Sequence, residues 1–322
     1  MSQVRPYEPL SRNSHLLTIM GNFWPREYDF SNYPLQNHFV TTDPDTQVLV
    51  QTQHPVKTPV GEVVLLHGLE GSGKSGYMIS MAWHALEAGW IVHRFHMRTC
   101  GGTENLCKTL YHAGLTSDLK AFLEQTVAAG RGLPIVPVGF SLGGNVALKL
   151  AGELGETDLI AGVCGVSVPI DLGVCTRRLS VGANFLYQRR FVSRMKARLI
   201  QTGRYTEDQL RECNTIYEID DRITAPAFGF GTADNYYATQ SAIGFLHAIR
   251  VPALLIQAKD DTMIPFELFS HPAVSANPRV KLLATEYGGH VAFLSKRGER
   301  FWVNEPILGF LGGLTTFREK MK

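Results

Sequence analysis

From residue 47 onward, short apolar runs alternate with stretches of helical periodicity, and this alternation constrains the fold more than any other feature of the chain. Several of the runs are continuously apolar, as expected for strands that helices cover on both faces. Strands that alternate with helices form a mostly parallel sheet through right-handed crossovers. The sequence therefore predicts the α/β class, with a mostly parallel central sheet flanked by helices. The expected strands are residues 48–51, 62–66, 91–95, 135–138, 159–166, 253–257 and 280–284.

Helical spacing of apolar residues between these strands predicts three helices, at residues 77–88, 118–129 and 143–154. Ser117 is the expected N-cap of the second helix, because its hydroxyl can accept a hydrogen bond from the first turn.

The domain organisation follows from the place where the alternation stops. Residues 171–249 are helix-leaning and too long for a structureless loop in a compact domain. We expect them to form a helical cap insertion over the C-terminal edge of the sheet, where ligands bind in open α/β sheets. Residues 46–170 and 250–322 would form the core, and residues 1–45 would form an N-terminal arm.

Charge and cysteine content exclude several classes of protein. The 322 residues include 31 Lys and Arg against 29 Asp and Glu, which gives a formal net charge of +2. Broad nucleic-acid binding needs a concentrated positive surface, so no nucleic-acid partner is expected. The five cysteines are scattered without a C-x-x-C pair, which argues against a disulfide framework and a structural zinc site. We expect no metal and no cofactor.

The apolar segments of the sequence contain no evident targeting or membrane-spanning signal. The first twenty residues contain no apolar core of a secretory signal. The longest apolar stretch, residues 159–174, is interrupted by Ser167, Pro169 and Asp171 and falls short of the roughly 20 residues that span a bilayer. We therefore expect no transmembrane anchor and a cytoplasmic location.

The most specific local signal is the pattern G-x-S-x-G formed by Gly139, Ser141 and Gly143, directly after the apolar run 135–138. Small residues on both sides of a serine between strand and helix permit a tight, strained turn that projects the hydroxyl. The same turn directs the next backbone N–H, that of Leu142, toward the reaction centre. We interpret Ser141 as a nucleophile.

A serine nucleophile needs a base that is held by an acid, and in such folds the acid follows the serine and precedes the histidine in the chain. Two adjacent aspartates, Asp260 and Asp261, follow the expected strand 253–257. We favour Asp261, which stands four residues before Pro265, and keep Asp260 as the alternative.

The candidate base follows the last expected strand. His290 comes after two glycines that allow a close-approaching loop, whereas His271 is followed by a proline in an expected surface turn. The predicted triad is therefore Ser141, Asp261 and His290.

The intermediate of such a reaction needs two N–H donors for its negative oxygen, one of them from the loop after an earlier strand. The expected strand 62–66 is followed by His67, Gly68 and Leu69. We predict Leu69 and Leu142 as the N–H donors of the oxyanion hole, with Gly68 providing room and His67 bracing the loop.

Residues 68–75 also match the phosphate-binding pattern GxxxxGK[ST] and lie between an expected strand and an expected helix. A nucleotide-binding protein would place Lys74 on the phosphates and Ser75 on magnesium. Against this reading, the expected strands 135–138 and 159–166 end in small or polar neutral residues and not in the acidic residue that such proteins use for magnesium at the usual place. P-loop nucleotide binding is therefore the remote alternative, with Lys74 otherwise a solvated charge.

Several strings of residues occur together that are typical of one family: residues 13–18 with 22–26, 67–72, 97–102, 111–114 with Asp118, 139–145 and 234–237. On these strings, which extend over nearly the whole chain, the sequence resembles the YheT-like branch of the α/β-hydrolases. That branch also includes the eukaryotic ABHD1/2/3-type lipases and the yeast ethyl-ester synthase/esterases. The chain departs from the family pattern at Thr99, where a glycine is more usual, and at Gly73-Lys74, which affects the expected substrate and not the reaction class.

The resemblance implies the α/β-hydrolase fold, the triad Ser141, Asp261 and His290, and a carboxylesterase or acylglycerol lipase activity. We therefore expect a serine carboxylic ester hydrolase that acts on small-molecule esters, acyl lipids included, through an acyl-enzyme. The alternative is an acyltransferase that uses the same residues with an alcohol as acceptor. The aromatic group of residues 228, 230, 236 and 237 is interpreted either as an acyl pocket or as ordinary core packing.

Overall fold

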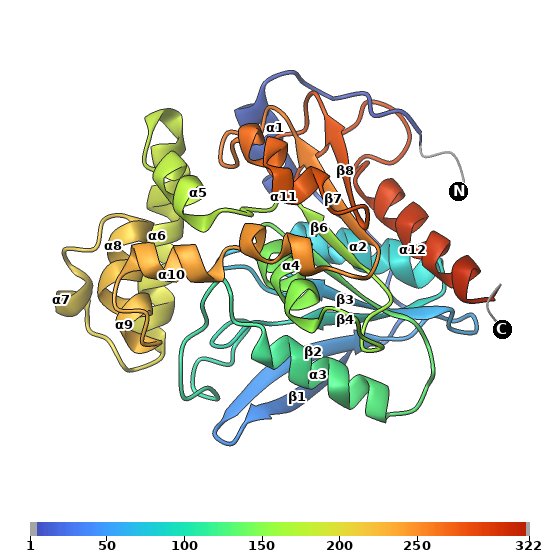
Figure 1. Ribbon diagram of the computed structural model, residues 1–322, viewed down its shortest axis with the longest axis horizontal. Helices are drawn as coiled ribbons and strands as arrows, with labels where there is room; N and C mark the ends of the chain where they lie inside the picture. The colour runs from blue at the N-terminus through green and yellow to red at the C-terminus, as the bar shows by residue number, and fades with distance from the viewer. Residues whose placement is uncertain (1–4, 320–322) are drawn as a thin grey trace.

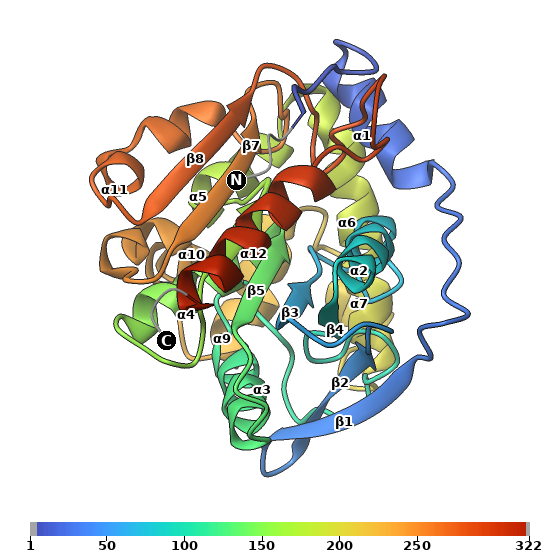
Figure 2. The same cartoon turned by 90° about the vertical axis from the view of Figure 1, so that its right-hand side faces the viewer.

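The computed structural model describes residues 5–319, and its centre is an eight-stranded sheet between layers of helices (Figure 1). The strand order is β1-β2-β4-β3-β5-β6-β7-β8, and Figure 2 shows β1 and β8 at opposite ends of the sheet. The pairs β1–β2 and β2–β4 are antiparallel and the other pairs are parallel. The strands are β1 (Gln36–Asp43), β2 (Thr46–Gln53), β3 (Gly61–Leu66), β4 (Trp90–Phe95), β5 (Ile135–Phe140), β6 (Val163–Val166), β7 (Ala253–Ala258) and β8 (Val280–Thr285).

Helices cover both faces of the sheet, which explains why its central strands are buried and mostly apolar. Along β3, Val64 and Leu66 pack toward α3 and α4, whereas Val63 and Leu65 pack toward α2 and α12. The period of two along a strand sends neighbouring side chains into opposite layers, so each strand contributes to two cores. The helices of the core are α2 (Gly76–Glu87), α3 (Ser117–Ala128), α4 (Leu142–Leu154), α11 (Pro272–Ser275) and α12 (Asn304–Glu319), and α1 (Ser14–Phe23) precedes the sheet.

A second group of helices connects β6 to β7 and stands to the left of the sheet in Figure 1. It has its own small core, which includes Val192, Met195, Leu199 and Leu210. A short π-helical turn, Asp220–Thr224, lies between α8 and α9. The helices are α5 (Leu172–Leu179), α6 (Phe185–Gln201), α7 (Glu207–Leu210), α8 (Ile216–Ile219), α9 (Ala225–Ala227) and α10 (Ala233–Gln240).

The mostly parallel sheet flanked by helices that the sequence predicted is confirmed, and all seven expected strands are present. The strand expected at 159–166 is shorter and begins at Val163. No sequence pattern indicated β1, which lies within residues 1–45 together with α1, because the side chains of β1 are mostly exposed and form no apolar run.

One local prediction was wrong. Ser117 is the first residue of α3 and not its cap; Thr116 occupies the N-cap position without a side-chain bond to the helix. The Thr116 hydroxyl instead donates a hydrogen bond of 2.6 Å to Glu153 of α4. A contact between two helices therefore takes the group that would otherwise cap α3.

Candidate active site

Ser141 lies in a strained turn between β5 and α4. Its φ of 52° falls in the left-handed region that a side chain rarely adopts, and its N–H donates to the carbonyl of Val166 on the neighbouring strand. The glycines around it are required by close contacts. A Cβ on Gly139 would overlap the carbonyl of Gly143, and a Cβ on Gly143 would lie 2.5 Å from the carbonyl of His67. The turn can therefore form only with glycine at both positions.

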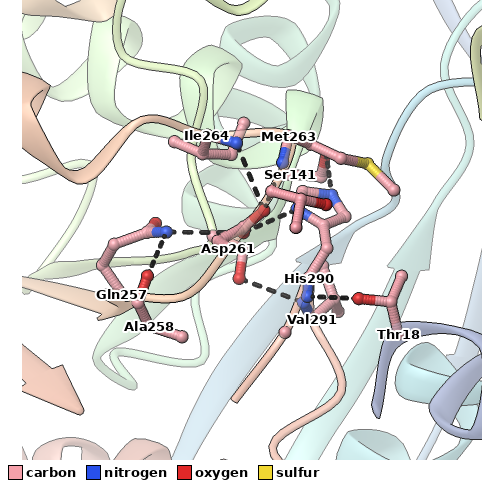
Figure 3. Close-up of polar contacts among 12 residues, drawn as sticks. Thr18, Ser141, Gln257, Ala258, Asp261, Met263, Ile264, His290 and Val291 are labelled. Atoms are coloured by element: carbon pink, nitrogen blue, oxygen red, sulfur yellow. Dashed lines mark hydrogen bonds and ion pairs between the residues drawn. The ribbon is translucent and has the colours of Figure 1, made fainter. Parts of the chain in front are cut away.

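The three predicted site residues form a chain of hydrogen bonds at the C-terminal ends of the strands (Figure 3). The Nε2 atom of His290 lies 3.0 Å from the Oγ atom of Ser141. The Nδ1 atom of His290 lies 2.9 Å from the Oδ2 atom of Asp261. This arrangement lets the imidazole accept the serine proton while the carboxylate orients the ring.

Backbone groups fix the orientation of Asp261, whose side chain is fully buried. Its Oδ1 atom accepts hydrogen bonds from the N–H groups of Met263 at 2.9 Å and Ile264 at 3.2 Å, which leaves Oδ2 for the histidine (Figure 3). The neighbouring Asp260 turns away and accepts from the N–H of Gly289 at 3.0 Å. Burial and the charge of Asp261 raise the pKa of Asp260. Of the two adjacent aspartates, the structure brings Asp261 to the imidazole.

The backbone of the histidine loop is held by two hydroxyl groups that the sequence did not point to. The N–H of His290 donates to Thr18 of α1 at 2.9 Å, and the N–H of Val291 donates to Ser167 at 3.1 Å. Gly289 has a φ of 62°, and a Cβ there would lie 2.7 Å from the Thr18 hydroxyl. No sequence pattern could have identified Thr18, because it lies 272 positions from the histidine it holds.

The loop after β3 approaches the serine as expected for an oxyanion hole. A Cβ on Gly68 would lie 3.1 Å from the Cβ of Ser141, so only a glycine fits there without displacement. The N–H of Gly68 donates to the hydroxyl of Tyr77 at 2.8 Å, which anchors the loop. Among the described residues, the N–H groups of Leu69 and Leu142 have no hydrogen-bond partner. Both residues line the same cavity as Ser141.

In the loop that resembles a P-loop, several backbone N–H groups already donate hydrogen bonds to other groups of the protein. The N–H of Gly73 donates to His96, the N–H of Ser72 to the hydroxyl of Ser75, and the N–H of Gly71 to the carbonyl of Gly68. A phosphate would have to break these bonds to reach the N–H groups. Lys74 is exposed, as expected for a solvated charge.

His67 braces the same region. It is fully buried, and its Nε2 atom accepts from the N–H of Met97 at 3.2 Å while Nδ1 contacts the carbonyl of Gly68 at 2.8 Å. Burial lowers the pKa of His67 to about 3, so the ring is neutral. The prediction of a bracing position fits this geometry.

A cavity opens beside Ser141 and His290, with an empty volume of about 860 Å³ that includes its mouth. Its wall is formed by loops after β3, β4, β5, β7 and β8 together with α5, α6, α8 and α10. Most of its wall is apolar, as in sites that bind hydrocarbon groups. The apolar residues from the helical segment are Leu172, Leu179, Phe191, Met195, Leu199, Ile216 and Ile219.

One part of the cavity wall carries a buried ion pair. The guanidinium of Arg198 lies 2.9 Å from the carboxylate of Glu70 and donates to the hydroxyl of Thr99 at 2.9 Å. It also lies 4.7 Å from the ring centroid of Tyr111. Thr99, where the chain departs from the pattern of the family it resembles, therefore contacts a residue of the cavity wall.

Asp220 is a second polar group of the cavity wall. Its carboxylate accepts a hydrogen bond of 2.7 Å from the hydroxyl of Tyr237. Burial raises the pKa of Asp220 to about 6, although hydrogen bonds from Tyr237 and Thr224 act in the opposite direction. Neither Asp220 nor Arg198 was singled out from the sequence as a site residue, because isolated charged residues in a helix-rich segment are usually exposed.

Two of the aromatic residues at positions 228, 230, 236 and 237 reach the cavity. Tyr236 and Tyr237 line the cavity. Phe228 and Phe230 pack around His112, with ring centroids at 4.6 and 5.2 Å, and Tyr236 contacts the same ring at 5.7 Å. The position of the two tyrosines is compatible with the acyl-pocket interpretation, which stays a prediction, and the two phenylalanines pack as the alternative interpretation expects.

Residues 5–319, the part of the chain that the structure describes, contain neither a metal-binding cluster nor a membrane-spanning helix. No group of three His, Cys, Asp or Glu side chains in that range is arranged to hold a metal ion. Within the same residues, no helix has both the length and the apolar character needed to cross a bilayer.

Comparison with known proteins gave matches over most of the chain. A family model described as "Alpha/beta hydrolase family" matches residues 63–302. The Escherichia coli (strain K12) protein YheT, whose name provisionally describes an esterase, is 32% identical over 95% of this chain and 92% of its own length. Phospholipase ABHD3 of Mus musculus is 29% identical over 72% of this chain and 58% of its own. Monoacylglycerol lipase of Saccharomyces cerevisiae is 26% identical over 77% of this chain and 58% of its own.

Solved structures share the fold at lower identity. The Pyrococcus furiosus esterase Pf2001 superimposes with a TM-score of 0.61 at 18% identity, covering 90% of this chain and 96% of that one. Est1E from Butyrivibrio proteoclasticus gives a TM-score of 0.58 at 12% identity, covering 87% and 99%. At these identities the likeness concerns the fold alone.

Proposed function

The chain belongs to the alpha/beta hydrolase family, and we propose that it is a serine carboxylic ester hydrolase that works through an acyl-enzyme. The relatives named as esterases and lipases support ester hydrolysis as the reaction class. The observation that carries the finer proposal is the hydrogen-bond chain from Ser141 through His290 to Asp261, at the mouth of an apolar cavity. The resemblance to the YheT-like branch is confirmed by the match to YheT itself.

In the first half of the reaction, the Oγ atom of Ser141 attacks the ester carbonyl while its proton passes to Nε2 of His290. The tetrahedral oxygen accepts hydrogen bonds from the N–H groups of Leu69 and Leu142, which have no other partner among the described residues. The bond to the alcohol oxygen then breaks, and the imidazolium returns the proton to the leaving alkoxide. Asp261 stabilises the imidazolium without taking its proton.

In the second half, a water molecule attacks the acyl carbonyl and gives a proton to His290. Breakage of the bond between the acyl carbon and Ser141 Oγ releases the acid, and the proton returns to the serine. The acyl chain is placed in the cavity against the apolar side chains of α5 and α6, such as Leu179 and Met195. Acyl esters, acyl lipids included, are thus the proposed substrate class.

Acyl transfer uses the same acyl-enzyme with an alcohol in place of water. The name of one yeast relative, a medium-chain fatty acid ethyl ester synthase/esterase, describes both directions for that protein. Adding ethanol to the hydrolysis assay and measuring ethyl ester would separate the two outcomes here.

The test is turnover of p-nitrophenyl esters from acetate to palmitate by the native chain and by Ser141→Ala. We expect the variant to lose roughly 10⁴–10⁶-fold in kcat with its fold intact, since only a hydroxyl is removed from a turn. Ser193→Ala, on the exposed face of α6, is the matched control and should turn over normally. Activity of Ser141→Ala within about tenfold of the native value would remove this serine from the mechanism.

A further inference from the structure

Two helices beside the histidine loop expose apolar side chains to solvent. On α1, Leu16, Ile19 and Phe23 follow one another at spacings of three and four residues and therefore share one face of the helix. Phe23 is 67% exposed and the other two are nearly half exposed. At the start of α6, Phe185 is about half exposed and Leu186 is 69% exposed. These five side chains are called the apolar ridge below.

Contacts between α1 and α6 join the two parts of the ridge into one surface, and Figure 2 shows these helices beside each other. His15 and Tyr187 stack with ring centroids 5.7 Å apart, and Nδ1 of His15 lies 3.0 Å from the tyrosine hydroxyl. The guanidinium of Arg190 lies 5.3 Å from the ring centroid of Phe23. Exposed apolar groups gathered in this way on a folded chain mark an interaction site.

The charged side chains within α1 and α6 are all positive. Neither α1 nor α6 contains an Asp or Glu, and residues 172–201 contain seven Lys and Arg and no acidic residue. Arg189, Arg190 and Arg194 are exposed, and within residues 5–319 none of them forms a salt bridge. Partial burial and the nearby charge of Arg194 lower the pKa of Arg190. A partner that binds this surface must therefore offer both an apolar region for the ridge and negative charge for the arginines.

The same two helices form part of the candidate active site on their other faces. Thr18 of α1 accepts the hydrogen bond from the His290 N–H, and Phe191, Met195 and Leu199 of α6 line the cavity. A surface that contacts the ridge would therefore lie beside the wall of the ester cavity.

We propose that the apolar ridge and its arginines dock the protein on an anionic lipid surface. Apolar side chains enter the boundary between headgroups and acyl chains, and Arg side chains bind the negative headgroups around them. A second copy of this chain is a poorer occupant, because two like-charged arginine clusters would face each other. Docking is separate from the ester chemistry proposed above, since no step of it uses Ser141.

The experiment is co-sedimentation of the full chain with phosphatidylcholine vesicles that either contain or lack phosphatidylglycerol. We expect binding to the anionic vesicles only, weakened by salt. Phe23→Gln with Leu186→Gln should lower the partition coefficient about 100-fold, because two exposed apolar side chains no longer enter the bilayer. Arg189→Gln with Arg194→Gln should lower it roughly 30-fold, since each charge contributes to headgroup binding.

Matched controls distinguish the ridge from exposed residues elsewhere. Phe39→Gln with Val56→Gln removes two comparably exposed apolar side chains, 55% and 73% exposed, outside the two helices. These controls should bind like the native chain, and all variants should hydrolyse a soluble short-chain ester at the native rate. Absence of native binding, or equal loss in ridge and control variants, would overturn the proposal. A concentration-dependent dimer that only the ridge variants abolish, without vesicle binding, would overturn it in favour of self-association.

Discussion

Asp220 gives a stability prediction with a worked magnitude. The carboxyl lies in the wall of the cavity, buried and hydrogen-bonded to Tyr237, and burial raises its pKa from 3.8 to about 6. Between these two values the folded chain binds more protons than the unfolded chain, so stability falls as the pH rises. The perturbation is Asp220→Asn, which removes the titration and leaves an oxygen that can still accept from the tyrosine.

The magnitude follows from the difference in pKa. When the pH is raised from below 3.8 to well above 6, the free energy of unfolding of the native chain falls by roughly 3 kcal/mol. About 1.4 kcal/mol of this decrease occurs between pH 5 and pH 8. The stabilisation by the protonated carboxyl is complete below the unfolded pKa of 3.8 and lost as the pH rises through about 6. Relative to Asp220→Asn, the native chain should therefore lose stability across this interval.

Urea unfolding of both proteins at several pH values between 5 and 8 measures this difference directly. Asp158→Asn, at an exposed position, is the control and should run parallel to the native chain. A free-energy difference between the native chain and Asp220→Asn that does not change with pH, or that changes in the opposite direction, would refute the reasoning.

Three further predictions concern the elements around the serine. Asp261→Asn should lower kcat by about 10⁴-fold because the amide favours the wrong imidazole tautomer, whereas Asp260→Asn should cost on the order of 1 kcal/mol of stability. Steady-state kinetics on both variants decides, and a kinetic defect confined to Asp260→Asn would reverse the assignment. Gly139→Ala should lower the free energy of unfolding, measured in urea, by at least about 2 kcal/mol. Gly244→Ala is the control and should be nearly neutral, because a Cβ at that position meets nothing within 4 Å. Equal stabilities of the two variants would contradict the steric argument. Lys74→Ala should leave ester turnover unchanged, and calorimetry should detect no magnesium-dependent nucleotide binding by the native chain. Nucleotide binding at micromolar affinity that is lost in the variant would restore the P-loop interpretation.

The sheet could be predicted because its signal is local. The strand β3 is buried along its whole length, and the run 63–66 within it is continuously apolar. The turn at Ser141 is similarly local, since overlap with Gly143 fixes the identity of Gly139 four positions earlier. Patterns of this kind are visible in a short window of sequence.

What the sequence did not indicate depends on contacts between distant segments. β1 has mostly exposed, polar side chains and is a strand only because β2 pairs with it. Thr18 holds the backbone of His290, and Glu70 pairs with Arg198 across 128 positions, yet neither pair has a spacing that a pattern could register. The net charge of +2 likewise did not indicate the basic segment 172–201, because acidic residues elsewhere in the chain balance its positive charge. The division into arm, core and cap and the cytoplasmic location stay predictions.

The most direct test of the central claim is to trap the acyl-enzyme. The chain is mixed with a p-nitrophenyl ester, quenched in acid during turnover and digested, and the peptide that contains Ser141 is measured by mass spectrometry. We expect that peptide to carry the mass of the acyl group, His290→Ala to reduce the rate at which the adduct forms, and Ser141→Ala to carry no adduct. An adduct on another residue, or full turnover without any adduct on Ser141 under conditions in which deacylation is slow, would contradict the proposed mechanism.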